Sequence, residues 1–243
     1  MTRIARTYER RALQQADSVL ALSPYTIRSL APMLGGKEAH LAFCGVDTNL
    51  FHPRDQAAAS SSDGYILCVA RLFDARKNVA MLLRAYASLT QVRSDIPDLR
   101  LVGEPLSDEG RQILNGLGIA EKVHCDGPTH GEDLANIYRG ASFFVLPSDE
   151  EGLGIVILEA MATGLAVVST ASGGPEVAVT DGETGFLTPV GDQEALKSAM
   201  LKLIDDPVLR DRFGAAGRRV AEARFSLEST GAVFLQEYDK LLA

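Results

Sequence analysis

Residues 142–164 read Ser-Phe-Phe-Val-Leu-Pro-Ser-Asp-Glu-Glu-Gly-Leu-Gly-Ile-Val-Ile-Leu-Glu-Ala-Met-Ala-Thr-Gly. The apolar run that ends at Leu146 predicts a buried strand, and the pattern after Gly154 predicts a helix over about residues 155–163. Glu151 is therefore expected on a strand-to-helix loop, and Glu159 just over one turn into the helix. A strand, a short loop and a helix in this order are typical of an α/β protein.

The loop between these two carboxylates suits an anionic ligand. Glycines at two positions let a ligand approach the backbone closely, and the first turn of the helix offers unpaired N–H groups and a positive dipole end. A carboxylate on each side of such an anion cradle fits a ligand with hydroxyl groups at both ends and phosphates between them, as in a nucleotide-sugar. The candidate ligand-binding residues of this stretch are Gly152, Leu153, Gly154, Ile155, Val156 and Glu159, with Glu151 as a candidate contact to sugar hydroxyls.

Composition excludes several classes of protein. The chain has 243 residues, of which 46% are hydrophobic and 23% charged, as in ordinary globular proteins. No apolar run reaches the roughly 18 residues of a membrane helix, and no secretory signal is recognisable. The net charge of −8, without a basic block, makes nucleic acid an unexpected partner.

The cysteines and histidines indicate reduced thiols and no metal. Cys44, Cys68 and Cys125 are widely spaced, which predicts free thiols in a cytoplasmic protein. A peripheral location at the inner membrane face stays open. Cys68 and Cys125 fall in predicted strands and are expected to be small buried hydrophobes. The four histidines lack the spacing of metal ligands.

From residue 64 onward, apolar strands alternate with helical patterns. The strands are continuously apolar, as in a parallel sheet that is covered on both faces, and the alternation predicts a Rossmann-like doubly wound α/β domain. The predicted strands are residues 65–70, 99–102, 122–125, 143–146, 166–169 and 185–188. Helices are expected over residues 78–89, over residues 131–138 and through most of the stretch after residue 193.

The first 50 residues do not fit this domain. They predict helices over residues 2–16 and 24–33 and strands over residues 18–22 and 39–43, too few elements to close a core of their own. We therefore expect residues 1–53 to be the remnant of another domain. Residues 54–225 would form the ligand-binding domain, with a linker-like stretch at 57–64, and residues 226–243 a C-terminal helix that packs back on the N-terminal part.

Topology predicts where the chemistry lies. In a doubly wound sheet, ligands bind at the carboxyl ends of the strands where strand order reverses, between the first and fourth strands in the common order. Arg71 and Lys77 follow the first strand, and the Glu151 loop follows the fourth. We expect both groups to face one crevice, in which Arg71 and Lys77 bind a diphosphate and Glu159 binds a ribose diol. Arg76 competes with Lys77 for the second phosphate contact.

Weaker signals come from three other loops. Glu104 follows the second strand at the same edge, and Val123 opens the third strand, where its backbone could contact a base. Residues 173–176, Gly-Gly-Pro-Glu, could line a sugar pocket or only shape a turn. A glycosidase-type acid/base pair explains neither the glycines nor the cations.

Many spaced positions together resemble the donor-side signature of retaining family 4 (group 1) glycosyltransferases, which have the GT-B fold of two Rossmann-like domains. The resemblance covers essentially the whole chain, including the junction at residues 45–53. Its residues are Glu151-Gly-Leu-Gly-Ile, Leu158-Glu159-Ala-Met-Ala, Gly164, Val167-Val168, Gly173-Gly174-Pro175-Glu176, Asp181-Gly182 and Gly185, with Arg71-Leu72 and Lys77-Asn78 upstream.

The resemblance implies a transferase that moves a sugar from a nucleotide donor with retention. It implies that Glu151 contacts the donor sugar, Gly152 to Gly154 give backbone contacts to sugar and phosphate, and Glu159 holds the ribose. Arg71 and Lys77 would stabilise the leaving diphosphate, with no cofactor and no metal. The family's acceptor-binding half, with its glycine-rich loop and catalytic histidine, has no counterpart in this sequence.

Three functional hypotheses therefore remain. The first is a glycosyltransferase, or its donor half, acting on an unidentified glycan, lipid or small-molecule acceptor; we expect a truncated gene product, or a split enzyme completed by a second chain. The second is a non-catalytic nucleotide-sugar binding module. The third, a nucleotide-sugar epimerase, lacks a convincing set of acid and base residues.

Overall fold

The computed structural model describes residues 3–54 and 64–242, so the linker-like stretch predicted at 57–64 lies outside the described residues except for Gly64. Its centre is a sheet of six parallel strands in the order β5-β4-β3-β6-β7-β8. The strands are β3 (Tyr65–Val69), β4 (Leu99–Val102), β5 (Val123–Asp126), β6 (Ala141–Leu146), β7 (Val167–Thr170) and β8 (Gly185–Thr188). The predicted doubly wound parallel sheet is confirmed, and strand order reverses between β3 and β6.

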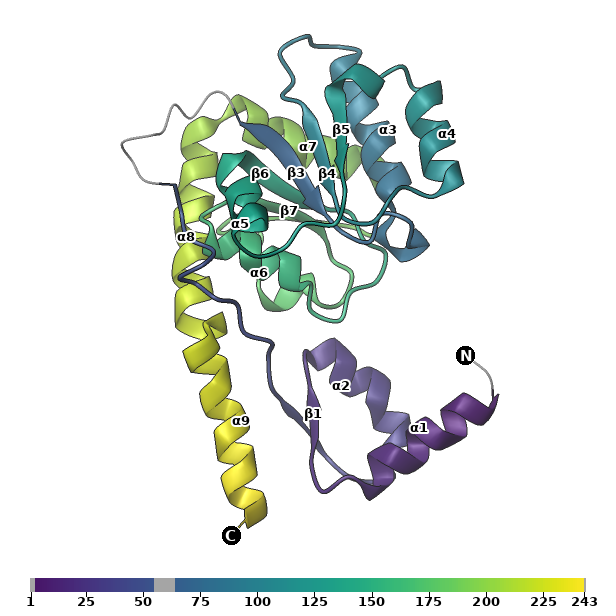
Figure 1. The fold of residues 1–243 in the computed structure, drawn as a ribbon, viewed down its shortest axis with the longest axis vertical. Coiled ribbons are helices and arrows are strands. Elements are labelled where there is room, and N and C mark those ends of the chain that lie inside the picture. Colours follow the sequence, from purple (N-terminus) through teal and green to yellow (C-terminus); the bar gives the residue numbers. More distant parts are fainter. Residues whose placement is uncertain (1–2, 55–63, 243) are drawn as a thin grey trace.

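Helices cover both faces of this sheet (Figure 1). On one face α3 packs against α4 and α7, and on the other α6 packs against α5 and α8. We call the six strands and these helices the sheet domain. The helices are α3 (Val79–Thr90), α4 (Asp108–Gly116), α5 (Gly131–Gly140), α6 (Ile155–Ala162), α7 (Gln193–Asp205) and α8 (Pro207–Phe225). The core between the layers is apolar, with Phe143, Phe144 and Tyr138 fully buried.

Local sequence explains where these helices begin. Asp192 caps α7 by accepting a hydrogen bond from the Ala195 amide at 2.9 Å. Asp206 caps α8 in the same way, and Pro207 at the first helical position needs no amide partner there. Before α6, Gly154 adopts a left-handed conformation with φ +80°, which side chains disfavour, so the chain turns sharply from the loop into the helix.

Residues 3–41 form a separate group of elements, the N-terminal unit. It contains α1 (Arg3–Gln15), β1 (Val19–Ala21), α2 (Pro24–Leu30) and β2 (Ala39–Leu41), and the two strands pair in parallel. These elements lie close to the predicted ranges. That they are the remnant of another domain stays a prediction.

Two stretches of chain meet between the N-terminal unit and the sheet domain. Val46 forms an isolated bridge with Ser226, and Phe43 packs edge-on against Phe225 at 5.1 Å between ring centroids. The last helix, α9 (Leu227–Leu242), starts at this point and runs beside the N-terminal unit in Figure 1. Electrostatic interaction between Glu237 of α9 and His40 of β2 agrees with that placement.

Candidate functional site

The candidate site lies at the carboxyl edge of the sheet, where β3 and β6 are neighbours. Lys77 and Glu151 touch there although 74 residues separate them, with 2.5 Å between Nζ and Oε1. The Ser148 hydroxyl donates to the same carboxylate oxygen at 2.7 Å. Glu151 is only 8% exposed, so this carboxylate is held by a cation and a hydroxyl in a place largely shielded from water.

The two loops that carry this ion pair are fastened to each other beside it. Asn78 donates through Nδ2 to Asp149 Oδ1 at 2.8 Å, and the Asp149 amide donates to the Arg76 carbonyl at 2.7 Å. Asn78 has φ +45°, a left-handed conformation that asparagine tolerates better than most residues. Its side chain also caps α3 by accepting from the Met81 amide. The loop after β3 is therefore fixed against the loop after β6.

The other two cations of this region pair with Asp74. Arg71 lies 3.1 Å from Asp74, with 52% of its side chain exposed, and Arg76 lies 2.8 Å from the same carboxylate oxygen. The hydrogen bond from Arg76 is the largest of the effects that lower the pKa of Asp74 to about 2. Of the two competing cations, Lys77 contacts Glu151 and Arg76 does not. Arg71 stands at the same edge, on the exposed side.

The loop from Gly152 to Gly154 leads into α6 as the sequence predicted, and Ile155 and Val156 are the first residues of the helix. Gly152 is exposed, and Ile155 begins the helix with 44% of its surface exposed. Leu153, in contrast, is 2% exposed and packs in the core, so only its backbone is available to a ligand. Because the helix starts at a glycine, no N-cap side chain occupies its first-turn amides.

Glu159 lies on α6 and bonds to a tyrosine that sequence reasoning missed. The Tyr138 hydroxyl is 2.8 Å from Glu159 Oε2 and 3.2 Å from the Val156 carbonyl. Burial raises the pKa of Glu159 to about 6, against the opposing effect of the hydrogen bond from Tyr138. A half-buried carboxylate with one oxygen engaged can still accept hydrogen bonds from a diol.

A hollow of about 320 Å³ opens beside these loops, at the carboxyl ends of β3, β4 and β5. We call it the edge hollow. Glu104 lies between two of its lining residues, and the hollow is large enough for a planar heterocycle. Its walls include Leu72, Gly103, Pro105, Leu106, Arg111, Leu114, Cys125, Asp126 and Gly127.

The structure corrects two expectations on β5. Val123 begins the strand, three residues before Asp126, so it lies at the amino edge of the sheet and not at the hollow. The carboxyl ends of parallel strands all lie at one edge of the sheet. The first residue of a strand therefore lies at the opposite edge, away from the hollow. Cys125 is exposed and not buried, because β5 is an edge strand of the sheet.

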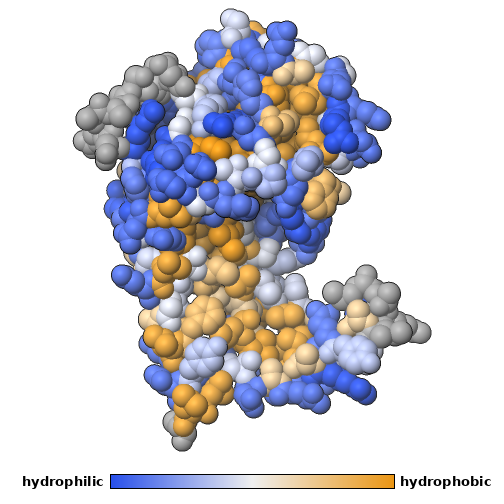
Figure 2. All heavy atoms as spheres, in the orientation of Figure 1, coloured by the Kyte–Doolittle hydropathy of each residue, from blue (hydrophilic) through white to orange (hydrophobic). Residues whose placement is uncertain are grey.

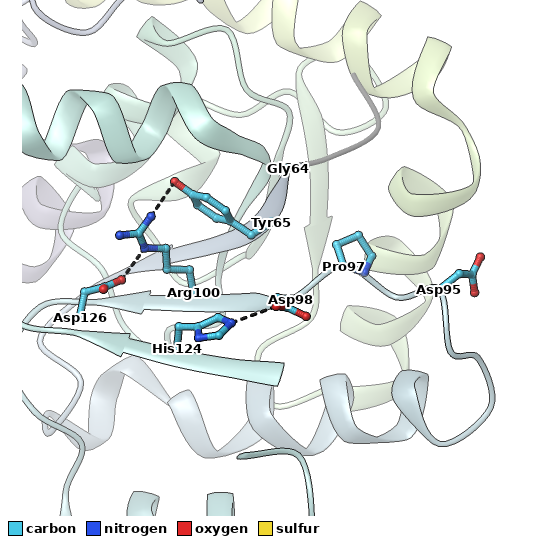
Figure 3. Close-up of a pocket in the computed structure, with 8 residues that line it drawn as sticks. All are labelled: Gly64, Tyr65, Asp95, Pro97, Asp98, Arg100, His124 and Asp126. Atoms are coloured by element: carbon cyan, nitrogen blue, oxygen red, sulfur yellow. Dashed lines mark hydrogen bonds and ion pairs between the residues drawn. The ribbon is translucent and has the colours of Figure 1, made fainter. Parts of the chain in front are cut away.

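A second hollow, of about 630 Å³, lies on a face of the sheet and shares Asp126 with the edge hollow, and Figure 3 shows its lining. We call it the face hollow. Arg100 pairs with Asp126 at 2.5 Å and donates to the Tyr65 hydroxyl at 3.2 Å. His124 lies 2.9 Å from Asp98. These charged groups satisfy one another, so we assign the face hollow no ligand.

Within residues 3–54 and 64–242 there is no cluster of three or more histidine, cysteine or acidic side chains that could hold a metal ion. In the same described ranges, no helix combines the length and apolar character needed to cross a membrane.

Comparison with curated proteins gives relatives that are named mannosyltransferases and glycosyltransferases. GDP-mannose-dependent alpha-(1-6)-phosphatidylinositol monomannoside mannosyltransferase of Mycolicibacterium smegmatis is 35% identical over 251 residues, covering 96% of this chain and 64% of the relative. D-inositol 3-phosphate glycosyltransferase of Streptomyces avermitilis is 38% identical over 196 residues, covering 73% of this chain and 42% of the relative. The chain thus spans less than two thirds of the length of these relatives.

Solved structures agree on the fold. Sucrose-phosphate synthase from Thermosynechococcus elongatus superposes with a TM-score of 0.85 at 29% identity, covering 99% of this chain and 62% of that chain. Anabaena HepE in complex with UDP and glucose superposes with a TM-score of 0.87, covering 99% of this chain and 68% of that chain. At 21% identity the second likeness shows the fold alone.

The sequence of the sheet domain shows to which protein family the chain belongs. Residues 53–220, more than half of the chain, match the family described as glycosyl transferases group 1. The protein therefore belongs to the group 1 glycosyl transferases.

Proposed function

We propose that this chain binds a nucleotide-activated sugar at the carboxyl edge of its sheet and takes part in transferring that sugar, with retention, to an acceptor. The observation that carries the proposal is the contact between Lys77 and Glu151 at the point where strand order reverses. This contact brings a cation and a carboxylate together beside the uncapped first turn of α6.

In this proposal the diphosphate of the donor lies between Lys77 and the first turn of α6. Negative charge develops on the diphosphate as the bond to the sugar breaks, and fixed cations and amides stabilise that charge more than they stabilise the bound donor. Arg71 can leave Asp74 and join Lys77, because its side chain is half exposed. No metal is needed for this stabilisation.

The rest of the donor follows from the same placement. Glu159 accepts hydrogen bonds from the ribose diol, and the base enters the edge hollow. Glu151 and the backbone of Gly152 face the sugar. GDP-mannose is the first donor to test, because the relatives include mannosyltransferases that are named GDP-mannose-dependent. Acceptors that carry a phosphorylated inositol are the first to test for the same reason.

A second candidate function is a donor-binding subunit that another polypeptide completes. Its support is the surface of α9 and the N-terminal unit, where large apolar side chains gather in the lower part of Figure 2. Exposed large apolar residues of α9 include Leu227, Leu235, Tyr238 and Leu241, and Leu41 of β2 is exposed as well. A pair of three-residue strands is too small to be stable by itself, which is consistent with a missing partner.

Binding and transfer measured separately distinguish the two functions. Isothermal titration of the full chain with GDP, UDP, GDP-mannose and UDP-glucose reports binding, with EDTA present to remove metal ions. Release of the nucleotide in the presence of phosphatidylinositol mannoside or inositol phosphate reports transfer. Binding with transfer supports the enzyme, binding without transfer supports the subunit, and no binding of any of these nucleotides contradicts both.

A further inference from the structure

The N-terminal unit reaches the proposed donor site through Tyr25, at the start of α2. Its hydroxyl donates a hydrogen bond to Glu150 Oε1 at 3.1 Å, across 125 residues of chain. Glu150 immediately precedes Glu151. The tyrosine therefore joins an element outside the sheet domain to the loop that carries the central carboxylate.

The ring of Tyr25 also packs directly on the loop after β7. A Cβ placed on Gly173 would lie 2.6 to 3.0 Å from three carbons of the ring, closer than side-chain carbons come to each other. Gly173 has φ +106°, which side chains rarely adopt. Both the backbone conformation and the space under the ring therefore require glycine here.

The two loops that Tyr25 contacts are packed tightly on each other. A Cβ on Gly174 would lie 2.5 Å from the Leu153 amide nitrogen and 2.7 Å from the Gly152 carbonyl carbon. The Glu151 amide donates to the Ser172 carbonyl at 3.0 Å. A displacement of either loop would therefore move the other, and with it the carboxylate that faces the proposed sugar position.

Tyr25 is itself held in place by the turn before α2. The fully buried Ser23 side chain accepts a hydrogen bond from the Thr26 amide at 3.1 Å, and its Oγ lies 2.9 Å from Thr26 Oγ1. Pro24 restricts the backbone between them. The tyrosine thus projects from a fixed turn, and the end of α2 nearest the sheet domain is where Figure 1 shows the unit approaching the loops.

We propose that Tyr25 is a positioning residue for the sugar end of the donor site, acting through Glu150 and Gly173 on the loop that carries Glu151. The inference rests on the proposed function. Tyr25 contacts Glu150 on the loop assigned to the sugar and Gly173 on the loop packed against it, whereas the nucleoside is assigned to α6 and the edge hollow. Loss of Tyr25 should therefore weaken binding of the sugar part of the donor and spare binding of the nucleotide part.

The test is isothermal titration of the full chain with two matched pairs of probes, GDP with GDP-mannose and UDP with UDP-glucose. We expect Tyr25→Ala to weaken binding of the nucleotide-sugar about tenfold while binding of the nucleoside diphosphate changes less than about twofold. Tyr25→Phe keeps the ring on Gly173 and should cost about threefold. Tyr8→Ala is the matched control, because Tyr8 lies on α1 with 68% of its surface exposed.

A double-variant cycle identifies the hydrogen bond. Glu150→Ala should also cost about threefold, and the double variant with Tyr25→Phe should lose no more than either single variant, because each change removes the same hydrogen bond. Equal losses for nucleotide and nucleotide-sugar in Tyr25→Ala, or no loss for either, would overturn the positioning role while leaving donor binding intact. If the unaltered chain binds none of the four probes, the proposed function fails and this inference fails with it.

Discussion

Replacing Glu159 with glutamine should stabilise the fold and weaken nucleotide binding at the same time. Burial raises the pKa of this carboxyl from an ordinary value of 4.5 to about 6. The difference corresponds to about 2 kcal/mol, at about 1.4 kcal/mol for each pKa unit. Because the folded-state pKa is the higher one, the ionised carboxylate destabilises the fold fully above pH 6, and this effect disappears below about pH 4.5.

The stability part of the prediction follows from that sign. At pH 7.5, Glu159→Gln should raise the free energy of unfolding by about 1–2 kcal/mol, and near pH 4 it should change little. Glutamine can still accept the hydrogen bond from Tyr138, and the tyrosine hydroxyl has the Val156 carbonyl as a second acceptor. Urea unfolding at the two pH values measures the difference. Glu183→Gln, at an exposed turn, is the control and should change stability at neither pH.

The binding part follows from the loss of charge. Hydrogen bonds to a charged acceptor contribute about 1.5–3 kcal/mol, and neutral ones about 0.5–1.5 kcal/mol. For a ribose diol with two such bonds, the Kd for GDP or UDP should rise about 10- to 100-fold in Glu159→Gln at pH 7.5. The difference from the unaltered protein should shrink as the pH falls below 6. A variant that binds as tightly as the unaltered protein, or that is less stable at pH 7.5, would refute this reasoning.

Three further predictions concern other parts of the molecule. Lys77→Ala should lower turnover on a donor at least about 100-fold while the Kd for that donor rises less than about tenfold. The reason is that the cation acts mainly on charge that develops during the reaction. If turnover and affinity fall by the same factor, Lys77 stabilises the bound donor as much as the transition state. GDP or UDP at saturation should slow alkylation of the exposed Cys125 in the edge hollow several-fold, as peptide mass spectrometry can measure, while Cys44 reacts at an unchanged rate. Hydrogen exchange should show weak protection in residues 3–41, because their short paired strands leave unpaired edges; strong protection in the isolated monomer would contradict this.

The fold could be predicted from the sequence because its strands are buried on both faces. Continuous apolar runs such as residues 143–146 mark central parallel strands, and their alternation with helices leaves few arrangements. The same topology rule brought Lys77 and Glu151 together correctly, since both follow strands that must be neighbours at the reversal of strand order.

Side-chain environments could not be predicted in the same way. The sequence pattern around Cys125 predicts a buried strand residue. Its side chain is exposed because β5 lies at the edge of the sheet, which the pattern does not reveal. Tyr138 lies in a helix pattern that gives no sign of its bond to Glu159, which depends on how α5 and α6 pack. Ser148 could have been found, because it stands three residues before Glu151 on the same loop.

A stricter use of the topology rule would have directed the search for the base-binding site to the end of the third strand and not to Val123 at its start. Residues 125–127 lie at the carboxyl end of the third strand, whereas Val123 begins that strand at the amino edge. Contacts between elements far apart in sequence, such as that of Tyr25 with Glu150, carry no signal in one sequence. They depend on how the N-terminal unit sits against the sheet domain.

A crystal structure with a bound nucleotide-sugar tests the central claim most directly. Our account predicts a diphosphate between Lys77 and the start of α6, a ribose on Glu159 and a sugar beside Glu151. A ligand bound instead in the face hollow, among Tyr65, Arg100 and His124, would contradict it.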